Sequence, residues 1–279
     1  MSSPIAVVGA AGPTGLAAIR ALAASGAEVR ALVHRPEQAD AVLGAGAVAA
    51  VPIELDAPAS LPGALSGAAA VLHIPPVFNA REPEQVQASV DAALAAGIDR
   101  FVLHSVMHPF TLGVRHHQRK AMSEAIVRRS SLRWTILQPA MYAQTIMLYW
   151  RRSPAGLVIV PYSLDTPFTP VALTDVAEAT SVVLIESGHE FATYELGGPQ
   201  VLTGRQMLTA VCRELGEQRE IRRGDLSELA LPPEWSDSAR ADMAAMCEHY
   251  DAIGLSGGVR VLEMLLGHAA TPFERTIGA

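Results

Sequence analysis

The first half of the chain alternates between short apolar runs and longer segments whose apolar residues recur at helical spacing. The apolar runs predict strands, over 5–10, 28–33, 47–55, 68–76, 100–106 and 133–140. The segments between them predict helices, over 15–26, 36–44, 83–97 and 111–130. Strands that are apolar on both faces are typical of a parallel sheet with helices above and below it. The alternation therefore predicts an α/β protein with a doubly wound parallel sheet.

The alternation breaks after residue 140. Thr174 is expected to cap a helix that carries Asp175 in its first turn. The later elements are expected to be three helical segments and one strand, over 174–188, 203–216, 231–254 and 192–198. Some of these pieces are expected to return to the main sheet.

This break divides the chain into two expected units. Residues 1–150 are expected to form a Rossmann domain, to which residues 165–200 return. Residues 151–279 are expected to form a smaller, mainly C-terminal lobe that holds the substrate. With 279 residues, of which 50% are hydrophobic and 18% charged, the chain is long enough to bury cores of this size.

The formal charge of −7 at pH 7 narrows the range of partners. An acidic surface disfavours nonspecific binding to nucleic acid or to an anionic membrane, so small molecules and proteins are the expected partners. The sequence shows neither a signal-peptide pattern nor an apolar stretch of membrane-spanning length, so a cytoplasmic location is expected. Cys212 and Cys247 have neither disulfide nor metal-ligand spacing, so they are interpreted as buried apolar residues, and no metal site is expected.

The turn after the first predicted strand is rich in glycine. The stretch VVGAAGPTG holds Gly9, Gly12 and Gly15, with Pro13 and Thr14 between the last two. In such a strand–turn–helix unit the first glycine permits the tight turn, the second lets the backbone approach a pyrophosphate, and the third lets the helix pack on the strand. The helix N-terminus then presents free N–H groups and a positive dipole to the phosphates. The context predicts a dinucleotide-binding site, to which Thr14 adds a hydroxyl.

The end of the second predicted strand bears on which dinucleotide binds. NAD-binding folds usually place a carboxylate there, whereas this chain has His34 and Arg35. A guanidinium pairs with a 2′-phosphate through two hydrogen bonds, so NADP(H) is preferred over NAD(H); a solvated Arg35 that stacks on adenine is the alternative. Asp56 is expected either to accept from the adenine amino group or to be an ordinary loop carboxylate. The edge of the adenine ribose and pyrophosphate is expected to be lined by His73, Ile74 and Pro75.

Several motifs follow one another along nearly the whole chain. They are VVGAAGPTG, ALVHRPEQ, LHSV, HHQRKAMSEAIVRRSSLRWTILQPAMY, VALTDVAEA, YELGGPQVLTGRQML and LLGHAATPFERTIGA. In this order they resemble the NmrA-like group of atypical short-chain dehydrogenases/reductases. The resemblance implies an extended Rossmann core with a small C-terminal substrate lobe. It also implies NADP binding, either in a reductase of quinones and related compounds or in a regulator with little or no catalysis.

The only lysine of the chain, Lys120, lies on the helix predicted after the fifth strand, four residues after His116. Ordinary short-chain dehydrogenases carry a Tyr-x-x-x-Lys pair there. By resemblance, Lys120 would hydrogen-bond the nicotinamide ribose hydroxyls; a surface lysine is the alternative. His116, in the place of the tyrosine, would donate a proton or would be a solvated helix histidine. Ser105, after the fifth strand, would orient a substrate carbonyl or cap a turn.

The end of the sixth predicted strand supplies further candidate residues. Pro139 and Ala140 are expected to run beside the nicotinamide carboxamide. Several large side chains follow, and they are expected either to wall an apolar substrate pocket or to form core between the two units. These residues are Tyr142, Met147, Tyr149 and Trp150.

Together these features predict an NADPH-dependent reductase of a small, largely apolar carbonyl, enone, quinone or imine, a small-molecule substrate in each case. One rival is a redox sensor that binds NADP(H) without turnover and acts through a protein partner. Another is a non-redox enzyme that keeps the cofactor only as part of its structure. A homodimer is also left open by the sequence.

Overall fold

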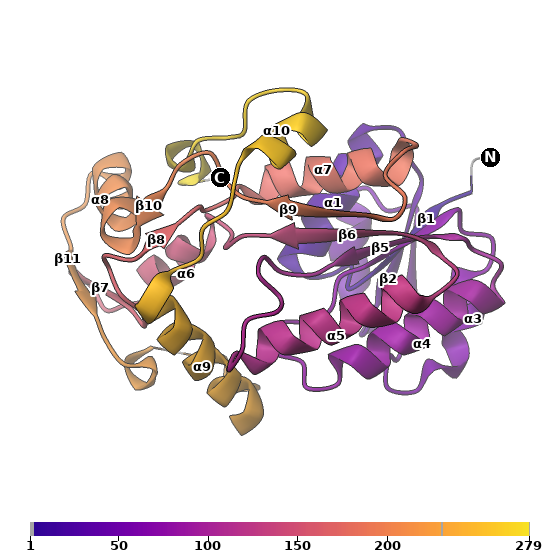
Figure 1. Ribbon diagram of the computed structural model, residues 1–279, viewed down its shortest axis with the longest axis horizontal. Coiled ribbons are helices and arrows are strands. Elements are labelled where there is room, and N and C mark those ends of the chain that lie inside the picture. Colours follow the sequence, from indigo (N-terminus) through magenta and orange to yellow (C-terminus); the bar gives the residue numbers. More distant parts are fainter. Residues whose placement is uncertain (1–2, 230, 279) are drawn as a thin grey trace.

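The computed structural model describes residues 3–229 and 231–278, and a seven-stranded parallel sheet forms its centre (Figure 1). The strand order is β3-β2-β1-β4-β5-β6-β9, and every neighbouring pair is parallel. The bounds are β1 Ile5–Val8, β2 Val29–Val33, β3 Ala49–Pro52, β4 Ala70–His73, β5 Arg100–His104, β6 Arg133–Pro139 and β9 Ala192–Leu196. The order reverses between β1 and β4, and in sheets of this kind ligands bind in the crevice beyond the carboxyl ends of the strands at such a point. The predicted doubly wound fold is confirmed.

Helices cover both faces of this sheet, because successive strand residues point to opposite sides. In β1, Val7 faces one core, while Ala6 and Val8 face the other. The helices of the first core are α1 (Pro13–Ala24), α2 (Ala39–Gly44) and α7 (Leu173–Ile185). Those of the second core are α3 (Leu61–Leu65), α4 (Glu82–Ala95) and α5 (Arg115–Arg129).

The second half of the chain adds two small sheets at the other end of the molecule (Figure 1). In one, β7 (Leu157–Val160) pairs in parallel with β11 (Glu220–Arg223); in the other, β8 (Pro167–Phe168) pairs antiparallel with β10 (Leu202–Thr203). The remaining helices are α6 Thr145–Arg152, α8 Gly204–Leu215, α9 Asp237–Ile253 and α10 Arg260–Leu266. Short 3₁₀ turns lie at Pro36–Gln38, Pro58–Ser60, Leu226–Glu228 and Phe273–Thr276. Within the stretch 165–200, β9 joins the main sheet, whereas β8 does not.

The start of α7 differs from the expectation. The helix begins at Leu173 after Ala172, and no side chain caps it, so the prediction that Thr174 is the cap is wrong. Asp175 lies in the first turn as expected, and its buried carboxylate accepts hydrogen bonds from the backbone N–H and the hydroxyl of Thr271, both at 2.6 Å. This carboxylate therefore ties the C-terminal tail to α7.

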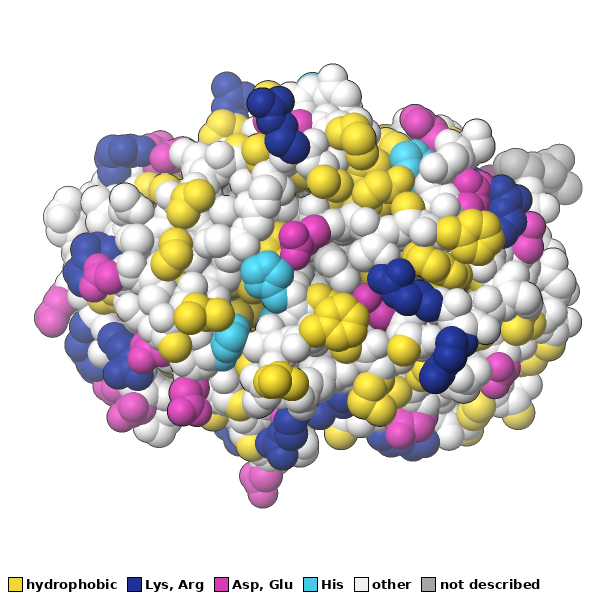
Figure 2. All heavy atoms as spheres, in the orientation of Figure 1, with side chains coloured by type: hydrophobic (Ala, Val, Ile, Leu, Met, Phe, Trp, Pro, Cys, Tyr) yellow, Lys and Arg dark blue, Asp and Glu magenta, His cyan; other side chains and the backbone are white. Residues whose placement is uncertain are grey.

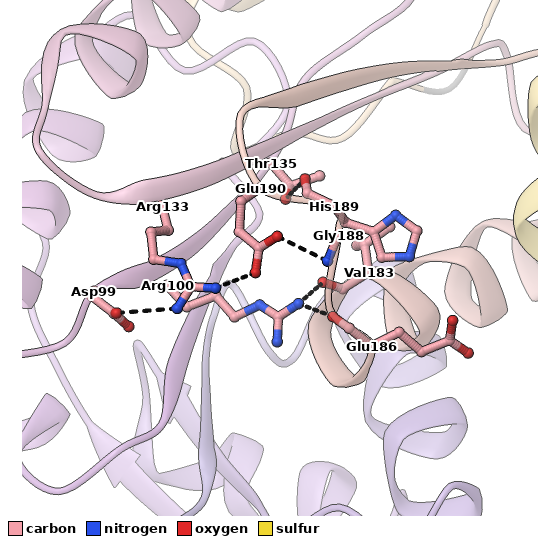
Figure 3. A network of polar contacts seen from close by, with 9 residues as sticks. All are labelled: Asp99, Arg100, Arg133, Thr135, Val183, Glu186, Gly188, His189 and Glu190. Carbon is pink, nitrogen blue, oxygen red and sulfur yellow. Dashed lines mark hydrogen bonds and ion pairs between the residues drawn. The ribbon is translucent and has the colours of Figure 1, made fainter.

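The amino ends of β5 and β6 hold the loop that leads into β9 (Figure 3). Arg100 donates to the carbonyl of Val183, at 3.1 Å, and to that of Glu186. Arg133 pairs with Glu190 of the same loop, and Thr135 donates to the carbonyl of His189 at 2.7 Å. These bonds fix β9 beside β6 at the edge opposite the carboxyl ends of the strands.

The surface carries charges of both signs. On the face shown in Figure 2, basic side chains are interspersed with acidic ones among the described residues. None of the helices in residues 3–229 and 231–278 is both long enough and apolar enough to cross a membrane. Both cysteines are buried as expected, and burial raises the pKa of the Cys247 thiol to about 12.

A buried carboxylate joins the two ends of the molecule. Asp242 of α9 is fully buried and lies 3.1 Å from Arg115 Nε, and its other oxygen pairs with Arg119. Both arginines belong to α5, so this ion-pair cluster connects the helix that carries the lone lysine to the C-terminal part of the chain.

We predict that Asp242→Asn lowers the free energy of unfolding by about 3 kcal/mol, because Arg115 and Arg119 then lose the buried carboxylate that balances their charge. Urea denaturation followed by tryptophan fluorescence measures this loss. The matched control is Asp165→Asn, whose exposed pair with Arg205 should matter little. Equal effects of the two substitutions would contradict the role given to Asp242.

Candidate cofactor and active site

The glycine turn between β1 and α1 leaves no room for side chains. Gly9 has a φ of +79°, and a Cβ atom there would lie 2.2 Å from the carbonyl oxygen of Ile74. A Cβ atom at Gly15 would lie 2.4 Å from the carbonyl oxygen of Ala10. At Gly12 the nearest atom would be 3.8 Å away, so that position is open. This geometry agrees with the tight turn predicted at Gly9 and the close helix packing predicted at Gly15, and the approach of Gly12 to a pyrophosphate stays a prediction.

The N-terminus of α1 is suited to an anion. Gly12 precedes the helix, Pro13 is its first residue, and both are exposed. The first turn carries no acidic side chain, so the positive end of the helix dipole is not neutralised from within the turn. Burial raises the pKa of Tyr142 to about 12, and the Thr14 side chain lowers this pKa, which places that tyrosine near the turn.

The loop after β2 presents a free cation. The backbone N–H groups of His34 and Arg35 donate to Gln38 Oε1 at 3.1 and 3.0 Å, which fixes the loop. His34 Nδ1 lies 3.5 Å from Glu54. Arg35 is exposed and makes no ion pair with any residue of 3–229 or 231–278, so its guanidinium is available to a ligand.

The loops after β3 and β4 place their candidate residues differently. Asp56 already pairs with Arg81, at 3.1 Å, and accepts from Gln85 at 2.7 Å, which is the behaviour of a loop carboxylate. Its contact with adenine stays a prediction. Ile74 approaches Gly9 through its backbone, and Pro75 is buried beside it.

The His73 ring does not lie in the crevice. It is fully buried on the α4–α5 side of the sheet, and neither ring nitrogen has a hydrogen-bond partner among the described residues. A side chain with no exposed surface cannot touch a cofactor without rearrangement, so only its backbone is placed to line the nucleotide. Burial, and next the charge of Lys120, lower the pKa of His73 to about 3.

The lone lysine is an interior residue. Lys120 is almost completely buried, and its Nζ lies 3.1 Å from Oε2 of Glu82, the first residue of α4. Ser123 donates to the other oxygen of Glu82 at 3.1 Å. The alternative of a surface lysine is therefore wrong. The bond to the nicotinamide ribose stays a prediction.

His116 is buried too, so it is not a solvated helix histidine. It is 6% exposed and its ring packs edge-on against Phe78, with 4.9 Å between the ring centroids. Burial, followed by the charges of Lys120, His117 and Arg119, holds the pKa of His116 well below its ordinary value. A neutral imidazole can donate a hydrogen bond but cannot act as a cationic acid.

Ser105 has a partner that the sequence did not reveal. Its hydroxyl donates to Glu124 Oε1 at 2.5 Å, and Gln138 donates to the same oxygen at 2.7 Å. The other oxygen of Glu124 lies 3.3 Å from Arg128. With its hydrogen committed to Glu124, Ser105 is left to accept a hydrogen bond from a ligand, not to donate one.

The residues after β6 divide into two groups. Pro139 and Ala140 continue the line of the strand, since the Pro139 carbonyl accepts from Met107 and Ala140 donates to Leu196. The other group is core: Met147, Tyr149 against Tyr162 at 5.8 Å, and Trp150 under the Arg219 guanidinium at 3.8 Å are all buried. Of the four predicted pocket residues, only Tyr142 keeps a partly open side chain.

No group of three or more histidine, cysteine, aspartate or glutamate residues within 3–229 and 231–278 is arranged to hold a metal ion. The residues that sequence reasoning missed are Glu82 and Glu124. Glu82 lies between α4 and α5 and Glu124 lies between α5 and the sheet, and only tertiary packing brings each to its partners, so the sequence offers no signal for them.

Comparison with known proteins agrees with this geometry. A family described as NAD(P)H-binding matches residues 9–180. Quinone oxidoreductase 2 of Escherichia coli is 25% identical over 98% of this chain and 97% of its own. A reductase of Streptomyces griseus that acts on (4-alkanoyl-5-oxo-2,5-dihydrofuran-3-yl)methyl phosphate is 29% identical over 97% of this chain and 95% of its own.

Solved structures share the fold along the whole chain. The NADPH-dependent quinone oxidoreductase QOR2 of Escherichia coli, complexed with NADPH, has a TM-score of 0.83 at 24% identity and covers 98% of each chain. Nmra, a negative transcriptional regulator in complex with NAD, has a TM-score of 0.79 at 18% identity and covers 98% of this chain and 94% of its own. The fold is thus found both in an enzyme and in a regulator.

Because His73 is buried and neutral, we expect the fold to lose stability in acid. The pKa of His73 is about 3 in the folded chain against 6.5 in the unfolded chain, so the unfolded state binds more protons between these values. The contribution of His73 to the free energy of unfolding is therefore fully present above pH 6.5. It falls as the pH falls, by about 2 kcal/mol at pH 5. We predict that His73→Leu flattens the dependence of unfolding free energy on pH by this amount.

Chemical denaturation at pH 7 and at pH 5 measures the effect of His73→Leu. His268→Gln is a control of opposite sign, because hydrogen bonds with the Ala269 carbonyl and with Glu178 raise the pKa of this exposed histidine. Loss of His268 should slightly steepen the fall of the unfolding free energy as the pH is lowered. Parallel stability curves for the wild type and His73→Leu would show that His73 is not the buried neutral group described above.

Proposed function

Since the chain belongs to the family of NAD(P)H-binding proteins, we propose that it is an NADPH-dependent reductase of a small, largely apolar carbonyl, enone, quinone or imine. The observation that carries this proposal is the glycine turn, in which Gly9 and Gly15 exclude side chains while α1 directs free N–H groups outward. The relatives that align over nearly the whole length are named as an oxidoreductase and a reductase, which supports the catalytic half of the proposal.

Each part of the chain has a defined task in this proposal. The turn and α1 bind the pyrophosphate, and Arg35 binds the 2′-phosphate. Lys120 orients the nicotinamide ribose, and Pro139 and Ala140 run beside the ring. When bound, reduced NADP supplies a hydride. The proton comes from water, since the hydroxyl hydrogen of Ser105 is committed to Glu124 and the N–H of neutral His116 donates a hydrogen bond only. The placement of the cofactor against the substrate accounts for much of the rate enhancement in this proposal.

A redox sensor is the second candidate. Two observations favour it: the tyrosine position is occupied by His116, whose ring is buried against Phe78, and the same fold occurs in a transcriptional regulator. In this candidate the same residues bind NADP(H), and the cofactor state is passed to a protein partner. A cytoplasmic location and a homodimer stay predictions for either candidate.

We predict that the protein consumes NADPH in the presence of at least one member of a panel of quinones, enones, ketones and imines. Loss of the absorbance of reduced nicotinamide measures this turnover. Tight NADPH binding without consumption across the whole panel would favour the sensor. Absence of binding would contradict both candidates.

We also predict that Arg35→Ala reduces the preference for NADPH over NADH by about tenfold or more, because a charge-assisted pair with the 2′-phosphate is lost. Binding of both cofactors by calorimetry gives this ratio. Arg205→Ala, which removes another exposed arginine far along the chain, is the control and should leave the ratio unchanged. An unaltered ratio in Arg35→Ala would show that the 2′-phosphate is recognised elsewhere.

A further inference from the structure

Within residues 3–229 and 231–278, the Lys120 ammonium has a single anionic contact. Its Nζ lies 3.1 Å from Glu82 Oε2, and the side chains are 6% and 0% exposed. Glu82 comes from the first turn of α4, and Ser123 on α5 donates to its second oxygen. The pair therefore lies inside the α4–α5 interface, where removing two charges from water is costly.

Glu124, four residues after Lys120 on α5, is also a buried carboxylate, but it is bound by Ser105, Gln138 and Arg128. The remaining titratable groups around Lys120 offer no negative charge. His73 lies on the same side of the sheet in β4, and His116 and His117 share its helix, whereas His104 of β5 points to the opposite face and is hydrogen-bonded to Thr180 of α7. Burial is the first cause, and the Lys120 charge a further one, that lowers the pKa of each of these histidines, so all four stay neutral near pH 7. Arg119 adds a second cation on α5, but it pairs with Asp242. Glu82 is thus the one counter-ion in contact with Lys120 among the described residues.

The geometry of the pair leaves the ammonium hydrogens available. Although Oε2 of Glu82 lies within ion-pair distance of Nζ, it has no hydrogen-bond partner among residues 3–229 and 231–278. The two groups therefore meet as charges, without an aligned N–H···O bond. An ammonium carries three donors, so Lys120 can still donate to hydroxyl groups of a ligand while Glu82 balances its charge.

We propose that Glu82 is a positioning residue that keeps Lys120 protonated and directed toward the nicotinamide ribose. This inference rests on the proposed function. Its physical basis is that a buried amine without an anion loses its proton more readily than a paired one. A buried ion pair is often replaceable by apolar residues without loss of stability, so a stabilising role alone does not explain why this pair is kept.

The single lysine makes a direct test available. Acetylation by acetic anhydride attacks only neutral amines, and Lys120 is the only lysine side chain in the protein. Peptide mass spectrometry separates it from the chain terminus. The rate of Lys120 acetylation as a function of pH therefore reports its protonation in the intact protein, without reference to catalysis.

We expect the midpoint of this profile to move down by at least about one pH unit in Glu82→Gln, because the isosteric amide removes the counter-charge. Glu82→Asp restores the charge and should return the midpoint most of the way. Glu84→Gln removes an exposed carboxylate from the same turn of α4 and should match the wild type. The pH above which NADPH binding weakens, measured by calorimetry, should move in parallel with the acetylation midpoint.

An unchanged midpoint in Glu82→Gln overturns the inference, even if the melting temperature falls, because that result assigns Glu82 to stability alone. Local loosening is recognised separately, since it speeds acetylation at every pH without moving the midpoint. If Glu82→Gln does not fold, Ser123→Ala serves in its place: it removes one hydrogen bond from Glu82 and should shift the midpoint in the same direction by a smaller amount. No shift in Ser123→Ala then overturns the inference.

The same measurement separates this inference from the proposed function. NADPH should slow the acetylation of Lys120 in the wild type if the ribose covers the ammonium. Tight NADPH binding with no protection overturns the inference and leaves the reductase proposal standing. A wild-type protein that binds no NADPH overturns the proposed function itself.

Discussion

The fold and the candidate site depend on the close backbone contacts of the β1–α1 turn. The Gly9 Cα lies against the carbonyl of Ile74, and Gly15 lies against the carbonyl of Ala10, at distances that exclude any Cβ atom. These contacts join the end of β1 to the end of β4, the two strands between which the sheet order reverses. They also bring the N-terminus of α1 to the mouth of the crevice. A side chain at either glycine would push apart the elements that form the nucleotide site.

A second constraint is the distribution of charge behind the crevice. The interior between the sheet and α4–α5 holds one ammonium and two carboxylates, and each charge has partners: Lys120 contacts Glu82, while Glu124 binds Ser105, Gln138 and Arg128. The histidines nearby remain neutral because burial, and next the charge of Lys120, lowers the pKa of each ring. The structure thus makes Lys120 a charged group and His116 a neutral one on the same helix, and the position of the nicotinamide beside them stays a prediction.

The parts of this arrangement that follow from local sequence could be predicted, and those that follow from tertiary contact could not. The glycine turn and the strands of the main sheet are recognisable because backbone conformation and apolar runs are local features. Side chains alternate between the two faces of a strand, and this alternation was not applied to His73. That residue points to the same side as Val71 and therefore into the α4–α5 core. The short helix α3 and the aromatic helix α6 were missed because alanine and proline, or large core side chains, obscure their spacing. Glu82 meets Lys120 only because α4 packs on α5, and no spacing within one helix reveals that pair.

Calorimetric titration of NADPH into the wild type and into Gly15→Val tests most directly whether a phosphorylated pyridine nucleotide binds at the β1–α1 turn. The account predicts one site per chain in the wild type and no measurable binding in the variant, with the wild type also binding NADH more weakly. A wild-type protein that takes up neither NADPH nor NADH, or a Gly15→Val variant that binds NADPH as tightly as the wild type, would contradict it.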